Sequence, residues 1–278
     1  MTFAKQELEE YETSKVCRIL NVSRSSFYRK PTGTKNEEKA IEEAIIQCFK
    51  QHKRRYGRIR IRKTLERKGI QVSEYKISQV LRENGLRAIS GRTGRKKAKK
   101  PSEQQYVEEN LIKNKFDVTE KNKLWCSDIT ELRCKGSKLY VCGIIDVGTR
   151  RNVGWAIDRF QTQKLVQDAF VMAVGRNPDR PKDAIFHSDR GCQYTAKRTK
   201  ELIEAHGFIK SMSRPGTPSD NQPIESFWRT LEAELPCIRD KEFSEAKLTI
   251  VEYIEMYYNS ERLHSGIGYN TPNEYAAR

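Results

Sequence analysis

Three closely spaced apolar runs in the second half of the chain constrain its fold more than any other feature. They are short and apolar or alternating, they are separated by glycine and polar turn residues, and they span residues 124–132, 138–146 and 152–157. Such runs predict three strands that pair as antiparallel neighbours. Apolar residues at helical spacing follow over 163–174, 196–206, 221–235 and 244–259, with brief apolar strands at 184–187 and 208–212. This order predicts an α/β fold, a mixed sheet with helices packed on it.

The first third of the chain predicts small all-α modules instead. Residues 13–30 fit a helix, a turn and a second helix capped by Ser23, a pattern typical of a helix-turn-helix. A second helical module follows from about 37 to 88, where Ser73 begins one helix and Gly69 and Gly85 each end one. Residues 91–104 contain six basic residues and almost no apolar ones. That composition indicates a flexible basic linker.

The positive charge of the chain is concentrated in these modules. Residues 1–100 hold 27 Lys and Arg against 11 Asp and Glu, whereas residues 101–278 hold 26 of each. A basic lobe joined to a neutral lobe favours nucleic-acid binding by the first, because a merely solubilising surface charge would be spread evenly. The DNA contacts that we expect are Arg24, Ser25, Arg29, Lys53, Arg54, Arg55, Arg58, Arg92, Arg95, Lys96 and Lys97, with Arg190 and Arg229 nearer the site described below.

The cysteine pattern and the lack of long apolar segments indicate in which cellular compartment the protein is found. The seven cysteines form no C-x-x-C pair, and no secretory apolar segment is present at the start of the chain. No apolar stretch approaches the roughly 18 residues that a membrane-spanning helix needs. We therefore expect a cytoplasmic protein that is associated with the nucleoid when DNA-bound and has no membrane partner.

Three carboxylates occupy positions that suit metal-dependent phosphoryl transfer. Asp128 lies on a predicted strand, Asp189 ends another, and Glu225 follows a loop near the start of a helix. Carboxylate oxygens are the ligands that Mg²⁺ prefers, and phosphoryl-transfer sites often hold two such ions. The chain has 37 acidic residues, so three of them can be singled out as a site only if the sequence around each one supports that role.

That surrounding sequence consists of segments found in order from about residue 13 to 275. They are His52–Gly57 to Gly85–Ala88, Trp125–Thr130, Ile145–Val147 with Arg150 and Gly154–Trp155, His187–Tyr194, Ser211–Gly216, Asp220–Asn221, Glu225–Phe227, and Tyr258–Asn259 with Arg262, His264, Gly268–Tyr269 and Thr271–Pro272. Together they resemble the OrfB-type bacterial insertion-sequence transposases, which carry the Asp-Asp-Glu core of the retroviral integrase superfamily.

The resemblance implies an RNase H-like fold and a transposase that cuts and joins insertion-element ends. It implies that Asp128, Asp189 and Glu225 are catalytic and bind two Mg²⁺ ions, for which Mn²⁺ can substitute. The implied partners are double-stranded DNA (terminal inverted repeats and target DNA), further copies of the chain on that DNA, and an orfA product, fused or separate. The expected domains are a helix-turn-helix (1–33), a second DNA-binding module (34–90), a basic linker (91–118), the catalytic core (119–234) and its C-terminal helical extension (235–278).

One residue departs from the family pattern. Seven residues after the catalytic Glu, where the family usually has Lys or Arg, this chain has Glu232. Our hypothesis is that Arg229, one helical turn after Glu225, supplies the missing cation. The alternative is an element copy with weakened activity.

Other readings of the chain remain open at this stage. A DNA-binding regulator with an idle core and an RNase H-like nuclease without joining activity are the alternatives to a transposase. His187 is interpreted as a packed residue rather than a metal ligand, and Asp146 as a turn-forming residue. Tyr258, Arg262 and His264 lack the partners of a tyrosine recombinase, so they are interpreted as a packing cluster or a DNA contact. Tyr194 and Arg190 are candidates for the rim of the site.

Overall fold

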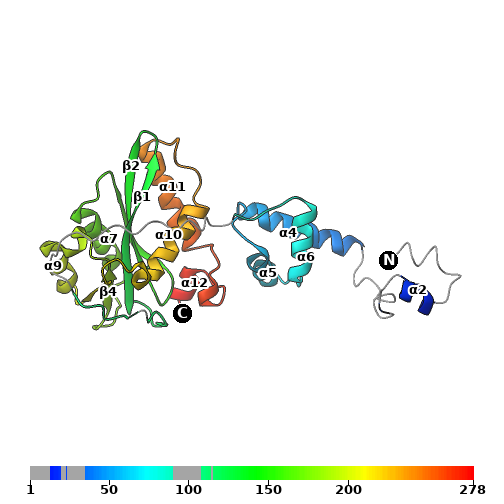
Figure 1. Cartoon of the computed structure of the whole chain (residues 1–278), viewed down its shortest axis with the longest axis horizontal. Coiled ribbons are helices and arrows are strands. Elements are labelled where there is room, and N and C mark those ends of the chain that lie inside the picture. Colours follow the sequence, from blue (N-terminus) through cyan, green and yellow to red (C-terminus); the bar gives the residue numbers. More distant parts are fainter. Residues whose placement is uncertain (1–12, 20–22, 24–34, 90–107, 114) are drawn as a thin grey trace. The chain divides into compact units, whose positions relative to one another are not determined.

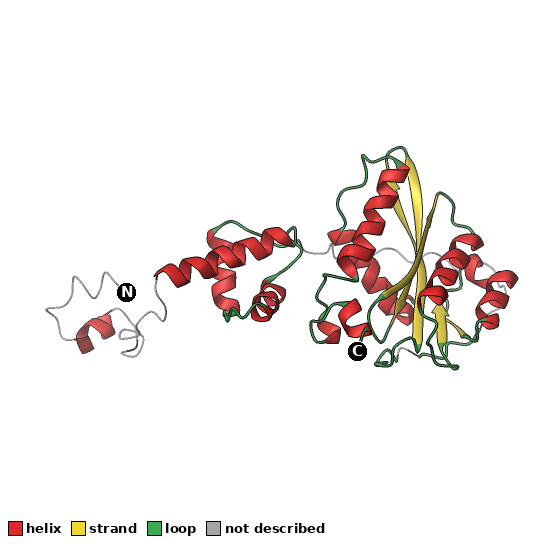
Figure 2. Ribbon diagram, turned by 180° about the vertical axis from the view of Figure 1, so that it is seen from behind, coloured by secondary structure: helices red, strands yellow, loops and turns green. Residues whose placement is uncertain are grey.

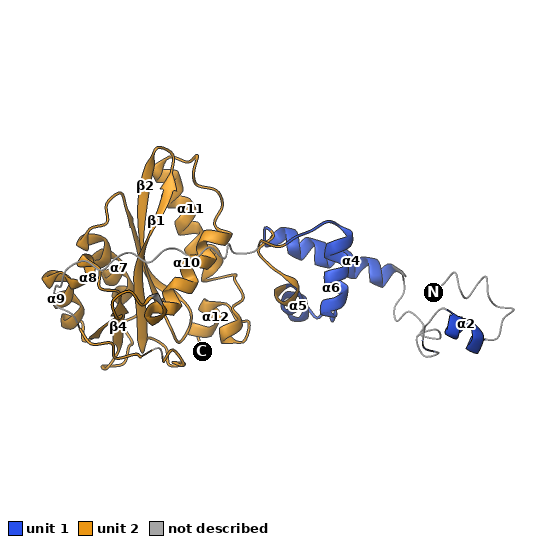
Figure 3. Cartoon of the chain, viewed as in Figure 1, with its two compact units in different colours: residues 1–53, 61–87 blue, residues 54–60, 88–278 orange. Residues whose placement is uncertain are grey.

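The structure is a computed structural model, and it describes residues 13–19, 23, 35–89, 108–113 and 115–278. The chain divides into two compact units (Figure 3). We call residues 1–53 and 61–87 the helical unit and residues 54–60 and 88–278 the sheet unit. The segment 54–60 therefore belongs to the sheet unit by its contacts, although its neighbours in sequence belong to the helical unit.

The helical unit contains α2 (Thr13–Ile19), α4 (Lys35–Gln51), most of α5 (Arg58–Arg67) and α6 (Glu74–Glu83). As predicted, Ser73 caps α6 by accepting a hydrogen bond from the amide of Lys76 at 3.2 Å. Gly69 and Gly85 follow α5 and α6 with φ of +79° and +64°, a conformation that favours glycine. The second half of the predicted helix-turn-helix, with Arg24, Ser25 and Arg29, lies outside the described residues.

A five-stranded mixed sheet forms the centre of the sheet unit (Figure 2). Its strands are β1 (Leu124–Cys134), β2 (Ser137–Asp146), β3 (Asn152–Asp158), β4 (Ile185–Ser188) and β5 (Ile209–Met212), in the order β3-β2-β1-β4-β5. The first three pair antiparallel, whereas β4 is parallel to both β1 and β5. The three predicted antiparallel strands and the two brief strands are thus confirmed within one or two residues at each end.

Helices cover both faces of this sheet (Figure 1). One face packs against α7 (Gln163–Arg176), α8 (Cys192–Thr195) and α9 (Lys197–Ala205). The core on that face contains Trp125, Ile144, Phe170, Phe186 and Phe208, all at most 3% exposed. The other face packs against α10 (Gln222–Glu234), with α11 (Phe243–Glu252) and α12 (Pro272–Ala276) on the same side.

The C-terminal helices differ from the sequence prediction in one respect. The single helix expected over 244–259 is α-helical only to Glu252 and continues as a π-helix, Tyr253–Tyr258. The wider turn carries three tyrosines, Tyr253, Tyr257 and Tyr258, that are at most 7% exposed. A π-turn interrupts regular helical spacing, and such turns are frequent at functional sites. Among the described residues, no helix is both long and apolar enough to cross a membrane.

Candidate active site

The first two candidate carboxylates lie on neighbouring parallel strands. Ser127 of β1 pairs with Ser188, the last residue of β4; Asp128 is the next residue within β1, and Asp189 is the first residue after β4. Parallel strands lie about 4.8 Å apart, so the two aspartates lie side by side at the carboxyl end of β4. Asp128 is partly buried and Asp189 is exposed. This is the edge at which α/β sheets usually place their sites.

The third carboxylate, Glu225, lies in the first turn of α10, which packs across β1 and β2. Two residues of this region hold the helix to the strand. The side-chain amide of Asn221 donates to the carbonyl of Ser127 at 2.9 Å, and Nε1 of Trp228 donates to Oδ2 of Asp128 at 3.1 Å. Glu225 stands between these two anchors in sequence, so its turn of helix lies next to Asp128.

The charges of Asp189 and Glu225 act on Asp128. Burial, followed by the negative charges of Asp189 and Glu225, raises the pKa of Asp128 to about 8. Such mutual repulsion is expected where acidic side chains share a site, and a bound cation relieves it. Within the described residues, no three His, Cys, Asp or Glu side chains stand at the mutual spacing of ligands of one metal ion. The fold therefore brings the carboxylates to one place without clustering them as tightly as bound ligands.

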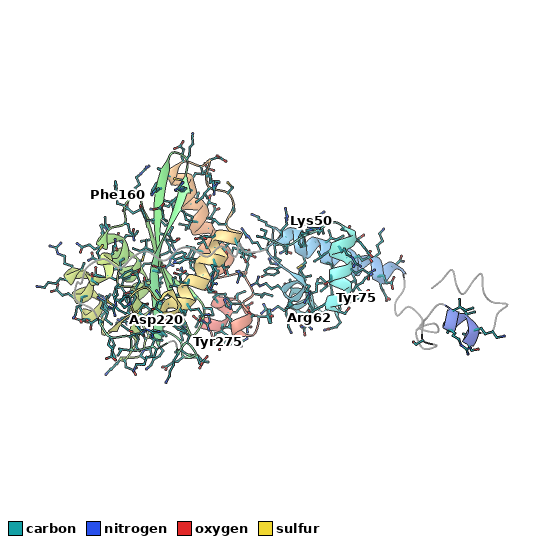
Figure 4. All side chains as sticks on the ribbon, viewed as in Figure 1. Lys50, Arg62, Tyr75, Phe160, Asp220 and Tyr275 are labelled. Carbon is teal, nitrogen blue, oxygen red and sulfur yellow. The ribbon has the colours of Figure 1, made fainter. Side chains whose placement is uncertain are left out.

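The loop that precedes α10 is held by an ion pair between a buried aspartate and an exposed arginine. Asp220, labelled in Figure 4, is fully buried, and its carboxylate accepts hydrogen bonds from the amide, Nε and Nη2 of Arg214, each 2.9 Å long. Asn110 donates to the same carboxylate at 2.8 Å. The hydrogen bonds from Arg214 hold the pKa of Asp220 well below its usual range. Asp220 thus closes the loop and fixes the point at which α10 begins.

The residues that follow Asp189 support the loop after β4. The amide of Gly191 donates to Oδ1 of Asp189 at 2.9 Å, and Nε of Arg190 donates to the carbonyl of Ser213 at 2.8 Å. Arg190 is only partly exposed. Tyr194 is 1% exposed, and its hydroxyl lies 2.9 Å from Oγ of Ser127. Tyr194 is therefore a residue of the interior beneath the site rather than of its rim.

His187 and Asp146 have the structural roles that we expected of them. Both are fully buried. The ring nitrogens of His187 lie 2.9 and 3.0 Å from the hydroxyls of Ser211 and Ser213. Asp146 accepts hydrogen bonds from the hydroxyl of Thr149 at 2.6 Å and from the amide of Gly148 at 3.3 Å. The first is a packed, hydrogen-bonded residue, and the second forms the turn between β2 and β3.

The residues predicted to contact DNA before the core fall into three groups. Lys53, Arg54 and Arg58 are exposed. Those of the basic linker, Arg92, Arg95, Lys96 and Lys97, lie outside the described residues, as do the three of the helix-turn-helix. Arg55 is only 8% exposed, because its Nε donates to the carbonyl of Glu234 at 3.0 Å and its guanidinium lies 4.0 Å from the ring centre of Tyr257. Its placement favours a structural role over the expected DNA contact.

Arg229 lies beside a surface hollow on α10. The hollow is lined by residues 131–133, Arg229, Glu232, Ala233 and 235–239, and we call it the α10 hollow. Arg229 and Glu232 are both exposed, four and seven residues after Glu225, and thus on the same face of the helix. Arg133 and Arg239 also line the hollow and are exposed. Three arginines therefore line the hollow together with two acidic residues, Glu131 and Glu232.

Similarity to known protein families and proteins shows which family this chain belongs to. Two family models described as Integrase core domain match residues 118–218 and 206–272, and an HTH-like domain model matches residues 35–95. The transposase for insertion sequence element IS904 of Lactococcus lactis subsp. lactis (strain IL1403) is 37% identical over 252 residues, which cover 90% of this chain and 98% of that protein. The chain belongs to the insertion-sequence transposases.

A second transposase, InsF for insertion sequence IS3A of Escherichia coli (strain K12), is 31% identical and covers 98% of this chain and 96% of its own length. Among solved structures, the HTLV-2 integrase catalytic core domain in complex with magnesium aligns with a TM-score of 0.40, at 15% identity, over 56% of this chain and 97% of that one.

The family assignment confirms the fold class and the activity that the sequence predicted. This transposase has an RNase H-like mixed sheet with flanking helices, preceded by an HTH-like helical domain. It is an enzyme, a DNA strand transferase that acts in the transposition of an insertion element. The integrase core superfamily is generally metal-dependent, and HTH-like and integrase domains imply DNA binding.

Sequence reasoning missed two residues of this transposase site. The sequence patterns assign no role at the site to Trp228, and Asn221 stands out only within the matching segment Asp220–Asn221. The partner of each lies about a hundred residues away in β1. The one available signal is the presence of an indole and an amide donor within four residues of Glu225 in the sequence, and this signal does not identify the acceptor of either donor.

Proposed function

We propose that Asp128, Asp189 and Glu225 bind two Mg²⁺ ions and that this site cuts and joins the ends of the insertion element. The observation that carries the proposal is that the pairing of β1 with β4 places Asp128 beside Asp189 while the charge of Glu225 acts on Asp128. The negative charges of Asp189 and Glu225 raise the pKa of Asp128, and three carboxylates so placed form a donor set that suits a hard divalent cation. When bound, the ions supply an activated attacking oxygen and a stabilised leaving oxygen.

The protein's own side chains have distinct tasks in this proposal. Asp128 and Asp189 stand on a rigid sheet, so they define where the cations bind. Glu225 would complete the set of ligands from the first turn of α10. Tyr194 and Ser127 fill the interior beneath them and exclude water from that side. Mn²⁺, which has similar ligand preferences, would support the same reaction.

The partners of the reaction follow from the charge and the domains. We propose that residues 1–33 and 34–90 and the linker 91–118 bind the terminal inverted repeats, while the core 119–234 with its extension 235–278 joins them to target DNA. Joining two ends in one complex requires at least two copies of the chain. An orfA product, fused or separate, would add further DNA binding, and the reaction would occur on nucleoid DNA in the cytoplasm.

The test is an assay of the full-length protein with labelled element ends and Mg²⁺. Nicked ends together with joined products are the expected result. Nicking without joining would indicate a nuclease, and a shifted but uncut band would indicate a DNA-binding regulator; either result would contradict the proposal. Chelation of the metal by EDTA is expected to stop both steps while leaving DNA binding by the helical modules intact.

We further propose that the phosphates of the element end lie along the α10 hollow and are met there by Arg229. The Arg229→Ala variant is expected to weaken end binding and to reduce the salt dependence of binding by about one phosphate contact. Strand transfer at fixed DNA concentration should fall roughly tenfold, the loss of one charge-assisted contact worth about 1.4 kcal/mol. The measurement is end binding across a salt series, together with joined product per unit time.

A matched control is Arg198→Ala, because Arg198 is exposed on α9 and thus lies on the opposite face of the sheet. It should leave binding and joining at wild-type levels. The Glu232→Lys variant tests whether Arg229 supplies the positive charge that Glu232 does not. If Arg229→Ala leaves strand transfer unchanged while Glu232→Lys raises it strongly, Arg229 does not compensate and the chain is a weakened copy.

A further inference from the structure

Trp228 connects the catalytic helix to the central strand of the sheet. It lies three residues after Glu225 on α10, its side chain is 3% exposed, and its Nε1 donates to Oδ2 of Asp128 at 3.1 Å. A tryptophan has only this one polar atom, and a buried indole N–H usually has a specific acceptor. Here the acceptor is a carboxylate of the proposed metal site, so the side chain that accepts this hydrogen bond is also one that would bind a cation.

A glycine makes room for this indole. Gly143 of β2 pairs directly with Asp128 of β1. A Cβ atom at position 143 would lie 2.7 Å from Cη2 and 3.1 Å from Cζ2 of Trp228. Real Cβ contacts are essentially never as short as the first of these, so a larger residue would displace the ring. The flat ring can therefore lie against β2 and still reach Asp128 on the adjacent strand.

A second hydrogen bond fixes the helix on the other side of Glu225. Asn221 precedes α10, is 4% exposed, and donates to the backbone carbonyl of Ser127 at 2.9 Å. Asn221 and Trp228 thus bind two consecutive residues of β1 from positions four before and three after Glu225. Glu225 lies on a helical turn with both ends attached to the strand that carries Asp128.

We propose that Trp228 is a positioning residue that orients the Asp128 carboxylate for the cation and holds Glu225 at a fixed separation from it. The inference rests on the proposed metal site. An N–H donor on Oδ2, together with the backbone hydrogen bond that Ile129 gives to the same carboxylate, restricts rotation of the Asp128 side chain and so fixes the direction from which a cation can approach it. Hydrogen bonds of this outer kind commonly set the orientation of a metal ligand, and their loss weakens metal binding.

The variant that tests this role is Trp228→Phe in the full-length protein, with Mn²⁺ as the probe. Phenylalanine keeps an aromatic ring beside Gly143 but removes the N–H donor. Mn²⁺ binding, measured by the electron paramagnetic resonance of free Mn²⁺, is expected to weaken about 10- to 100-fold. The Mn²⁺ concentration for half-maximal joining should rise by a similar factor, while the unfolding midpoint in EDTA stays near that of the wild type.

Trp155→Phe is the matched control. Nε1 of Trp155, on β3, donates to Oε1 of Glu255 at 2.6 Å, so this variant also removes one indole–carboxylate hydrogen bond. Its acceptor is not one of the three proposed metal ligands, so Mn²⁺ affinity should not change. Equal loss of Mn²⁺ affinity in both variants would overturn the positioning role, because the effect would then be a general one of indole loss.

Gly143→Ala gives an independent test from the opposite side of the contact. The added methyl group should displace the indole and weaken Mn²⁺ binding in the wild-type background. In the Trp228→Phe background it should add little, because the smaller ring lacks the Cη2 atom that the methyl group would meet. Such non-additivity is expected of two residues that act through one contact. Additive losses would overturn the inference.

The two proposals fail in different ways. If Asp189→Asn binds Mn²⁺ as the wild type does, the proposed metal site itself is wrong. If Asp189→Asn loses Mn²⁺ binding but Trp228→Phe retains it, the metal site stands and the positioning role is wrong.

Discussion

Asp189→Asn is expected to lose DNA cutting and joining by about 10³-fold or more, equivalent to at least about 4 kcal/mol of transition-state stabilisation. The amide is a poor ligand for Mg²⁺ and brings no negative charge to the site. Local structure should survive, because asparagine keeps the Oδ1 atom that accepts the amide of Gly191 at 2.9 Å. Asp189 is also exposed, so the substitution does not disturb the core.

Three measurements separate loss of chemistry from loss of folding. DNA-end binding should remain, because the helical modules are unchanged. In EDTA the variant should unfold at no lower temperature than the wild type, since it removes a negative charge that raises the pKa of Asp128. The control is Asp168→Asn, an exposed carboxylate on α7, across the sheet from α10. An Asp189→Asn protein that cuts at the control's rate would exclude Asp189 from the site.

Much of the sheet unit was predictable because local patterns agree with the final contacts. Short apolar runs became β1, β2 and β3, and the brief runs before Asp189 and Ser213 became β4 and β5. Ser73, Gly69 and Gly85 act within their own helices, so their roles depend on neighbours a few residues away. The candidate carboxylates were found for the same reason, since each lies within a local motif.

The sequence did not predict the contacts that join distant segments. Arg55 lies in a run of basic residues that suggested DNA, yet its acceptor is the carbonyl of Glu234, 179 residues later. Trp228 has an ordinary position on the apolar face of α10, and only the pairing of β1 with β2 places Asp128 and Gly143 beneath it. The π-helical turn at Tyr253 also arises from packing, because its tyrosines stack on arginines of other segments.

The second large effect that we expect is on stability, and it concerns Glu234, the buried acidic residue at the end of α10. The carboxylate of Glu234 accepts hydrogen bonds from Nε and Nη2 of Arg262 at 2.8 to 3.1 Å and from the hydroxyl of Tyr253 at 3.0 Å. Arg60 lies 3.9 Å from the same carboxylate. Burial alone would lower the pKa of Arg262, but the hydrogen bonds and charge of Glu234 raise it above its ordinary value. The carboxylate of Glu234 thus balances the positive charge of the buried Arg262 and part of the charge of Arg60.

Glu234→Ala is therefore expected to destabilise the sheet unit by about 3–5 kcal/mol, because it leaves Arg262 buried without a counter-charge. Urea unfolding followed by tryptophan fluorescence reports this unit alone, since Trp125, Trp155 and Trp228 all belong to it. The control is Glu242→Ala, which removes the Lys135–Glu242 pair whose side chains are 64% and 67% exposed. Exposed pairs of this kind contribute little to stability, because solvent screens the two charges.

A double variant shows whether charge burial causes the loss. Glu234→Leu with Arg262→Met removes both charges and keeps apolar volume, so it should recover much of the stability that Glu234→Ala loses. Glu234 is the last residue of the helix whose first turn carries Glu225. Glu234→Ala should therefore also reduce DNA joining under conditions in which the protein is still folded. The double variant should join DNA more efficiently than Glu234→Ala. If Glu234→Ala costs no more than Glu242→Ala, the cluster around Glu234 does not anchor α10, and the helix must be held by Trp228 and Asn221 instead.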